Sequence, residues 1–314
     1  MMLIREKAGP RGDQAAVTVI FGLGLIGRSV AASLLRQIDC SIRTAPVDWR
    51  DASVRAEQLR DLAENIVRIG PRRVDVVWTA GKAGFGAGPA EVTAEEGPFT
   101  DVVAMSEYLA DLLPAASHAF HLMSSAGGLF EGLRMVGSDT LPAPRRPYGE
   151  AKLAQELRCR NMRGGMATCI YRPSSVYGYA GVGGRAGLIN VLINNAWRHA
   201  PSRLFGDSAT VRDYVYAPDI GDFVAAMIGS ASPISGTFLL ASGKPSAMHE
   251  VVHMVERVLG QRLFVRFEPS PTNAQHITFS PAALPKGWKA TDLETGIRQT
   301  ARKLLYSFAT RSAA

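Results

Sequence analysis

The chain has 314 residues, of which 46% are hydrophobic and 20% are charged, and this balance excludes a disordered chain. No run of about 18 apolar residues occurs, and residues 1–16 are charged and glycine-rich where a secretory signal would be apolar. We therefore expect a cytoplasmic protein with no membrane partner. The formal net charge of +7 suits an acidic partner, but the basic residues are scattered and no nucleic-acid-binding motif accompanies them, so nucleic acid is not expected.

The three cysteines, Cys40, Cys159 and Cys169, show neither the spacing of a zinc site nor the even number of a disulfide framework. We predict that they are reduced packing residues and that the chain holds no metal.

Residues 1–16 are predicted to form a flexible tail, and after them short apolar runs alternate with longer amphipathic stretches. The predicted strands are 17–21, 40–46, 74–79, 118–123 and 167–171, and the predicted helices between and after them are 25–38, 51–69, 101–114 and 148–163. This alternation predicts an α/β fold with a Rossmann-type doubly wound parallel sheet over residues 17–178.

The pattern becomes less regular after residue 178. Helices are predicted at 187–199 and 219–230, and strands near 237–241 and 263–267. These pieces are too short for a second sheet of equal size. We predict that 206–232 returns to the Rossmann domain, and that 179–205 and 233–314 form a smaller substrate-binding lobe.

The stretch VTVIFGLGLIGRSV at 17–30 places glycines at 22, 24 and 27 between a predicted strand and a predicted helix. This arrangement is a dinucleotide-binding fingerprint, in which glycines permit a tight turn and the helix N-terminus faces the pyrophosphate. Asp48 follows about 20 residues after the motif, where a carboxylate binds the adenosine ribose and favours NAD. Arg50 leaves NADP open, because a guanidinium there could pair with a 2′-phosphate. Taken alone, GLGLIGRS also resembles the start of a prephenate-type dehydrogenase.

The sequence PYGEAK at 147–152 contains a YxxxK pattern. Residues four apart share one face of a helix, so the Lys152 ammonium is expected close to the Tyr148 phenol. A nearby cation stabilises the phenolate, which can then accept a hydroxyl proton while hydride leaves the same carbon for a nicotinamide.

Together these motifs resemble the extended short-chain dehydrogenases/reductases of the NAD-dependent epimerase/dehydratase family, which act on nucleotide sugars. The resemblance runs from about residue 17 to 304. It rests on the glycine motif, SSAGGLFEG after the strand at 118–123, YGEAK, RPSSVYG at 172–178, LFGDSATVRDYVYAPDIGDFV at 204–224 and LPKGWKATDLETGIRQT at 284–300. The prephenate-type dehydrogenases lack this order of motifs.

The resemblance implies a role for each matching residue. Ser125 matches the catalytic serine, with Ser124 as its neighbour in the substrate site, and Tyr148 matches the general acid/base. Lys152 also binds the nicotinamide ribose, and Arg212 contacts the substrate diphosphate, unless it forms a surface ion pair with Asp213 or Asp207. The residues expected at the cofactor are Gly22, Gly24, Leu25, Ile26, Gly27, Asp48, Trp49, Ala80, Tyr148, Lys152 and Pro173.

Two departures from the family pattern bear on function. Phe21 stands where the first glycine of the family motif is usual, which predicts an altered backbone path beside the pyrophosphate. Ala126-Gly127-Gly128 replaces the acid pair of the 4,6-dehydratases, so dehydration is not expected. The remaining hypothesis is an NAD-dependent nucleotide-sugar 4-epimerase, active as a homodimer through the helices at 101–114 and 148–163. The alternatives are an NAD(P)H-dependent 4-ketoreductase and a catalytically silent nucleotide-binding protein.

Overall fold

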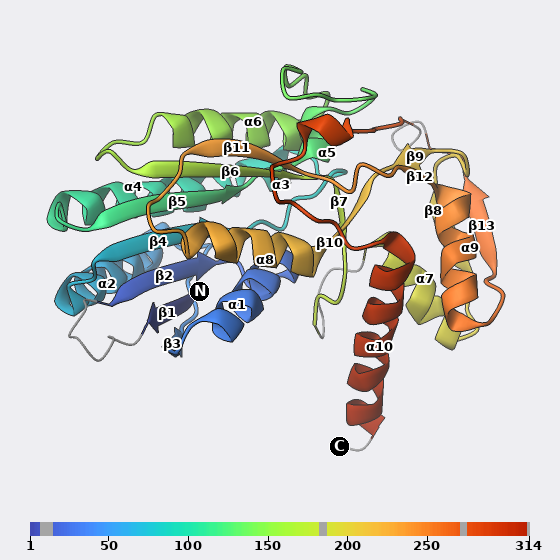
Figure 1. Ribbon diagram of the computed structural model, residues 1–314, viewed down its shortest axis with the longest axis horizontal. Coiled ribbons are helices and arrows are strands. Elements are labelled where there is room, and N and C mark those ends of the chain that lie inside the picture. The colour runs from blue at the N-terminus through green and yellow to red at the C-terminus, as the bar shows by residue number, and fades with distance from the viewer. Residues whose placement is uncertain (7–14, 182–186, 271–274, 313–314) are drawn as a thin grey trace.

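The computed structural model describes residues 1–6, 15–181, 187–270 and 275–312. They form an α/β fold, in which helices flank a mixed β-sheet, with a smaller lobe at one end (Figure 1). The sheet has seven strands in the order β11-β6-β5-β4-β2-β1-β3. Its strands are β1 (Met2–Glu6), β2 (Ala16–Phe21), β3 (Cys40–Thr44), β4 (Arg73–Trp78), β5 (Ser117–Met123), β6 (Ala167–Pro173) and β11 (Gly236–Leu240). All neighbouring pairs are parallel except those made by β1.

Helices cover both faces of this sheet, because its central strands are apolar on both sides. One face packs against α2 (Ala52–Ile69), α4 (Glu96–Leu112) and α6 (Pro147–Arg160). The other packs against α1 (Leu25–Gln37) and α8 (Ala217–Ile228), which also contact each other. The doubly wound Rossmann-type fold expected from the sequence is confirmed.

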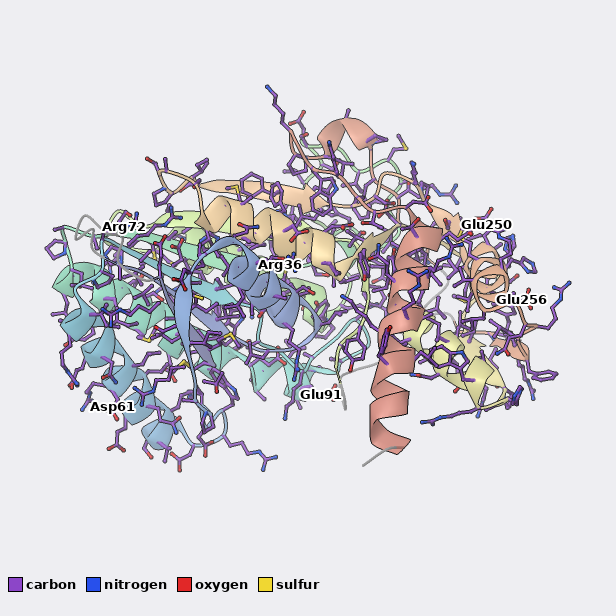
Figure 2. The ribbon with its side chains drawn as sticks, turned by 60° about the horizontal axis from the view of Figure 1, so that its bottom comes forward. Arg36, Asp61, Arg72, Glu91, Glu250 and Glu256 are labelled. Carbon is purple, nitrogen blue, oxygen red and sulfur yellow. The ribbon has the colours of Figure 1, made fainter. Side chains whose placement is uncertain are left out.

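The smaller lobe has its own apolar core, built on three helices and short strand pairs. Its helices are α7 (Leu188–Trp197), α9 (Met248–Leu259) and α10 (Leu293–Ser312), and its strand pairs are β7 (Ser175–Tyr177) with β10 (Tyr214–Tyr216), β8 (Ser202–Phe205) with β13 (Val265–Glu268), and β9 (Val211–Arg212) with β12 (Ser246–Ala247). Short helices α3 (Pro89–Thr93), α5 (Ala126–Leu129) and the 3-10 turn η2 (Pro281–Ala283) complete the described elements. Figure 2 shows Glu250 and Glu256 of α9 at the lobe end of the molecule and Arg72 and Asp61 at the opposite end.

The prediction of a flexible N-terminal tail was wrong for residues 2–6. They form β1, which lies between β2 and β3 and pairs antiparallel with both, with Met2 opposite Ile20 on one side and Thr44 on the other. Residues 7–14 lie outside the described part of the chain. The strand near 237–241 was also misplaced, because it joins the main sheet as β11 rather than the smaller lobe.

α4 begins before its predicted start. It starts at Glu96 rather than at 101, and Pro98 falls in its first turn, where a missing N–H leaves no hydrogen bond broken. The short helix α5 was not among the predicted elements. Within the described residues no helix is both long and apolar enough to span a membrane.

Candidate active site

The glycine turn follows β2 and is closed by the segment after β4. Gly22 has a φ of +91°, a conformation that favours glycine, and a Cβ there would collide with the backbone of Ala80. Thr79 fixes the contact, since its Oγ1 donates to the Gly22 carbonyl at 2.6 Å. A Cβ on Gly27 would in turn overlap that carbonyl. The two outer glycines are therefore required by close packing of the turn.

The middle glycine faces open space. Gly24 is exposed, no other atom lies within 4 Å of where its Cβ would be, and no side chain caps α1, which begins at Leu25. The first amides of α1, including those of Leu25 and Ile26, are thus available to an anion. This cradle fits the pyrophosphate of a dinucleotide.

Phe21 does not distort the turn. It is the last residue of β2 and is fully buried, with its ring 6.0 Å from that of Trp49 and 6.3 Å from that of Trp78. The turn begins one residue later, at Gly22. The structure shows no altered backbone path at Phe21, because the phenylalanine belongs to the core below the site.

The segment after β3 brings the acid expected at the adenosine ribose back toward the end of β2. Asp48 directly precedes Trp49, whose ring lies 6.0 Å from that of Phe21, although β1 separates β3 from β2 in the sheet. Its Oδ1 accepts the backbone amides of Asp51 and Arg50, and these hydrogen bonds lower the pKa of the carboxyl. Asp48 remains exposed and ionised, with its second oxygen still able to accept.

Tyr148 and Lys152 lie on the same face of α6, as the YxxxK spacing predicted. The Lys152 Nζ is 5.9 Å from the centre of the Tyr148 ring and donates to the carbonyl of Met123 and to Oε1 of Gln155. Lys152 is buried and Tyr148 is half-buried. Two of the three ammonium protons are thus used to hold the lysine at the end of β5, and the third is free for a ligand.

Ser125 reaches the same site through α5. It is the N-cap of that helix, and its Oγ accepts the Gly128 amide at 3.1 Å. Gly128 lies against the Tyr148 ring, where a Cβ would come within 3.1 Å of ring carbons. Gly128 thus lies between the Ser125 hydroxyl and the Tyr148 ring.

The Ser124 side chain points into the interior, toward α6. It is buried, and its hydroxyl donates to Oε1 of Glu156 at 2.6 Å. Glu156 is completely buried and also accepts two hydrogen bonds from Arg172 and one from Arg160. The role of Ser124 in binding substrate stays a prediction; in the structure its hydroxyl anchors α6 to the end of β5. Sequence reasoning missed Glu156, although it lies two helical turns after Tyr148 on the same face.

Arg212 lies beyond the catalytic residues, at the junction with the smaller lobe. It lines a cavity of about 340 Å³ together with Tyr177, Phe205 and Tyr214. Burial lowers the pKa of its guanidinium below the usual value. The carboxylate of the neighbouring Asp213 is buried and bonds instead to Ser174, Ser242 and Gly243, so Asp213 shapes the loop that presents Arg212.

One further cluster near Tyr148 was not expected from the sequence. Arg146, two residues before Tyr148, pairs bidentately with the buried Glu131 at 2.6 and 2.8 Å and lies 4.5 Å above the ring of Phe85.

Pro173, predicted beside the nicotinamide, is buried at the end of β6. The glycine turn and these groups meet at one edge of the sheet, where the carboxyl ends of β2, β4, β5 and β6 lie side by side.

The NAD dependent epimerase/dehydratase family model matches residues 18–240. The chain belongs to this family. An uncharacterised protein of Sinorhizobium fredii is 29% identical over 124 residues, which are 38% of this chain and 29% of that protein. A UDP-glucuronate 4-epimerase of Thermodesulfobacterium geofontis is 26% identical over 165 residues, which are 50% of each chain. The chain thus spans half or less of the length of these relatives.

A solved structure supports the fold. The UDP-glucose 4-epimerase of Thermus thermophilus in complex with NAD is similar with a TM-score of 0.74 and 21% identity, covering 91% of this chain and 97% of that one. The extended short-chain dehydrogenase/reductase architecture inferred from the motifs is confirmed.

Proposed function

We propose that this protein is an NAD-dependent nucleotide-sugar 4-epimerase. The observation that carries the proposal is the convergence of an open pyrophosphate cradle at Gly24 with Tyr148, Lys152 and Ser125 at the same edge of the sheet. Membership of the epimerase/dehydratase family and the named activity of the T. geofontis relative support it.

Several residues would hold the cofactor. The amides of Leu25 and Ile26 would bind the pyrophosphate, Asp48 the adenosine ribose, and Lys152 the nicotinamide ribose. Trp49 and Ala80 flank this path. When bound, NAD supplies a reversible hydride acceptor and donor.

The chain's own residues would move the proton. Tyr148, as phenolate, accepts the proton of the sugar 4-hydroxyl, and the Lys152 ammonium stabilises the phenolate. Ser125 donates a hydrogen bond to the same sugar oxygen and orients it. Tyr148 returns the proton after the 4-keto sugar has turned its other face. Arg212 binds the diphosphate and so keeps the substrate attached during that turn.

The test is interconversion of UDP-glucose and UDP-galactose by purified protein without added cofactor. We expect turnover, together with NAD released on denaturation in near-stoichiometric amount. Stoichiometric consumption of NADPH on a nucleotide 4-keto sugar, without epimerisation, would instead support the ketoreductase. Absence of both activities across UDP-, dTDP- and GDP-sugars would favour a silent nucleotide-binding protein.

We also infer a homodimer formed through α4 and α6 of a cytoplasmic protein. Tyr108 and Leu112 of α4 and Leu157 of α6 are each more than 40% exposed, and an interface between two copies through these helices would cover them. Light scattering on the wild type and on Leu157→Lys checks this, since the variant should become monomeric.

A further inference from the structure

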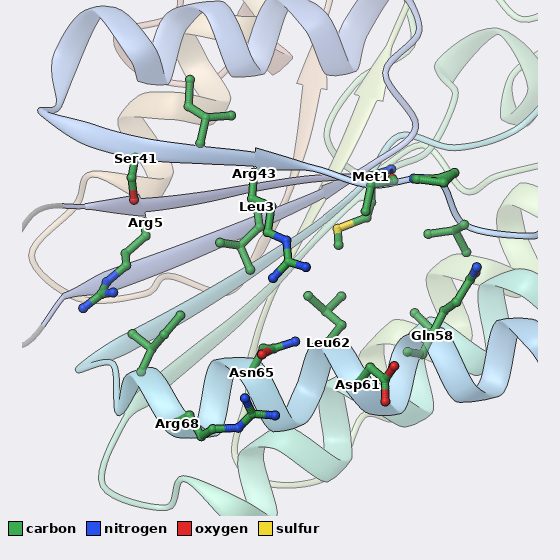
Figure 3. A pocket seen from close by; sticks show the side chains of 16 residues that line it. Met1, Leu3, Arg5, Ser41, Arg43, Gln58, Asp61, Leu62, Asn65 and Arg68 are labelled. Atoms are coloured by element: carbon green, nitrogen blue, oxygen red, sulfur yellow. Dashed lines mark hydrogen bonds between the residues drawn. The ribbon is translucent and has the colours of Figure 1, made fainter.

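A second cavity lies on the sheet face beside α2, away from the catalytic tyrosine. Its volume is about 580 Å³, within the range of about 300–1,000 Å³ that small-molecule sites occupy. It is bounded by β1, β3, the segment after β3 and α2 (Figure 3). It exists because the sheet gains β1 and extends past the edge of α2, which packs on the more central strands.

Charged and amide side chains line this cavity beside apolar ones, whereas the rest of the interface between α2 and the sheet is apolar. From β1 and β3, side chains on the sheet face toward α2 line the cavity. Among them, Arg5 and Arg43 extend from the sheet toward α2 (Figure 3). On α2 the residues at helical spacing that face the sheet edge are Gln58, Asp61, Asn65 and Arg68. Leu3, Leu59 and Leu62 form an apolar floor. Polar groups on two facing elements above an apolar floor are typical of a ligand site rather than of a protein core.

Arginines dominate one end. In the strand register Arg5 lies opposite Ser41 and Leu3 opposite Arg43, so the two arginines are diagonal neighbours whose backbones are about 7–8 Å apart. Neither forms an ion pair with any carboxylate in the described part of the chain, and Arg68 meets only Glu64, at 3.8 Å. Like charges in this arrangement repel, and an anion between them would remove the repulsion.

Acceptor groups mark the other end. Asp61 lies seven residues before Arg68 on α2, about 10 Å along the helix axis. A carboxylate accepts hydrogen bonds from hydroxyl groups. Gln58 is held beside it, because its Oε1 accepts the Asp48 amide at 2.8 Å, and its amide nitrogen remains a donor. The cavity therefore matches a molecule with an anionic group at one end and hydroxyl groups about 10 Å away.

We propose that this cavity binds a phosphate monoester of a polyhydroxylated molecule, a sugar phosphate or a nucleoside monophosphate, at a site separate from the dinucleotide and the nucleotide sugar. Three arginines and one aspartate give the cavity a charge of +2. A phosphate monoester carries about −1.5 to −2 at pH 7 and offers three acceptor oxygens to guanidinium groups, which a carboxylate does not.

The test is titration calorimetry with glucose 1-phosphate, UMP and inorganic phosphate, each added to protein already saturated with NAD and UDP-glucose. We expect one of the two esters to bind at least tenfold more tightly than inorganic phosphate, which also identifies the body that the site takes. Arg5→Gln and Arg43→Gln should each weaken that binding at least tenfold. Arg60→Gln, an exposed position of α2 outside this cavity, is the matched control and should bind as the wild type does.

Four results would overturn the proposal. The first three are absence of ester binding, ester binding that is unchanged in the two arginine variants, and inorganic phosphate binding as tightly as both esters. The fourth is ester binding to the apo protein that disappears when NAD and UDP-glucose are present, which would place the ligand in the proposed cofactor and substrate sites. Thermal melting of each variant checks folding, which these exposed side chains should not disturb.

Discussion

Replacing Glu156 with glutamine would leave the Arg172 guanidinium nearly buried beside a neutral partner. In the native protein the Glu156 carboxylate is fully buried and accepts two hydrogen bonds from Arg172, at 2.7 and 2.8 Å, and one from Ser124. Arg172 is only 12% exposed, whereas Arg160, the other partner, is 40% exposed and is largely solvated. The loss in free energy of unfolding should therefore come almost entirely from the broken ion pair with Arg172.

Removing one partner of a buried ion pair costs about 3–5 kcal/mol, and glutamine, which can still accept hydrogen bonds, should fall near the lower end. At about 2–4 °C per kcal/mol for a domain of this size, we expect the melting temperature to fall by about 6–12 °C. Circular dichroism measures this directly. The control is Glu150→Gln, an exposed acid in the first turn of the same helix, where loss of charge costs about 0.3–1 kcal/mol. If Glu156→Gln lowered the melting temperature no more than this control, the anchoring role of Glu156 would be refuted.

Three other changes test the site and the sheet beneath it. Tyr148→Phe should lower kcat by about 10²–10⁴-fold with bound NAD unchanged, and undiminished turnover would exclude Tyr148 as the acid/base. Gly22→Ala should lower the melting temperature because of its positive φ, whereas Gly24→Ala, at a φ of −77°, should leave melting unchanged and weaken NAD binding; equal melting of both would contradict the packing described. Burial alone would lower the pKa of His121, but hydrogen bonds of its ring to Asp75 and Cys169 raise the pKa from 6.5 to about 9. Stability from this group should be fully present below pH 6.5 and decline toward pH 9 in urea titrations, and the decline should vanish in Asp75→Asn.

Local patterns allowed the cofactor turn and the catalytic helix to be predicted from the sequence. The spacing of Gly22, Gly24 and Gly27 specifies a strand, a turn and a helix start, and YxxxK specifies one helix face. Both patterns follow from short-range geometry, although Thr79 and Ala80, which close the turn, come from the distant end of β4.

The remaining features depend on distant partners. The segment MLIRE has no clear alternation of apolar and polar residues, so only the edges of β2 and β3 make it a strand. From the sequence alone, Glu156 is expected to be a solvated helix residue. It is paired in the fold because β6 places Arg172 beside it. Ser124 and Ser125 are equivalent in the sequence, and the position of Glu156 decides which hydroxyl turns inward.

The antiparallel strand β1 also has a consequence for the order in which the sheet assembles. A parallel pair of β2 and β3 would have to wait for the crossover helix α1, but β1 and β2 are close in the chain and can form a hairpin-like pair without it. β3 can then add to the outer edge of β1 after α1 has formed. The edge nearest the glycine turn could thus be ordered early during synthesis, and pulse-labelling hydrogen exchange should show the amides of β1 and β2 protected before those of β3.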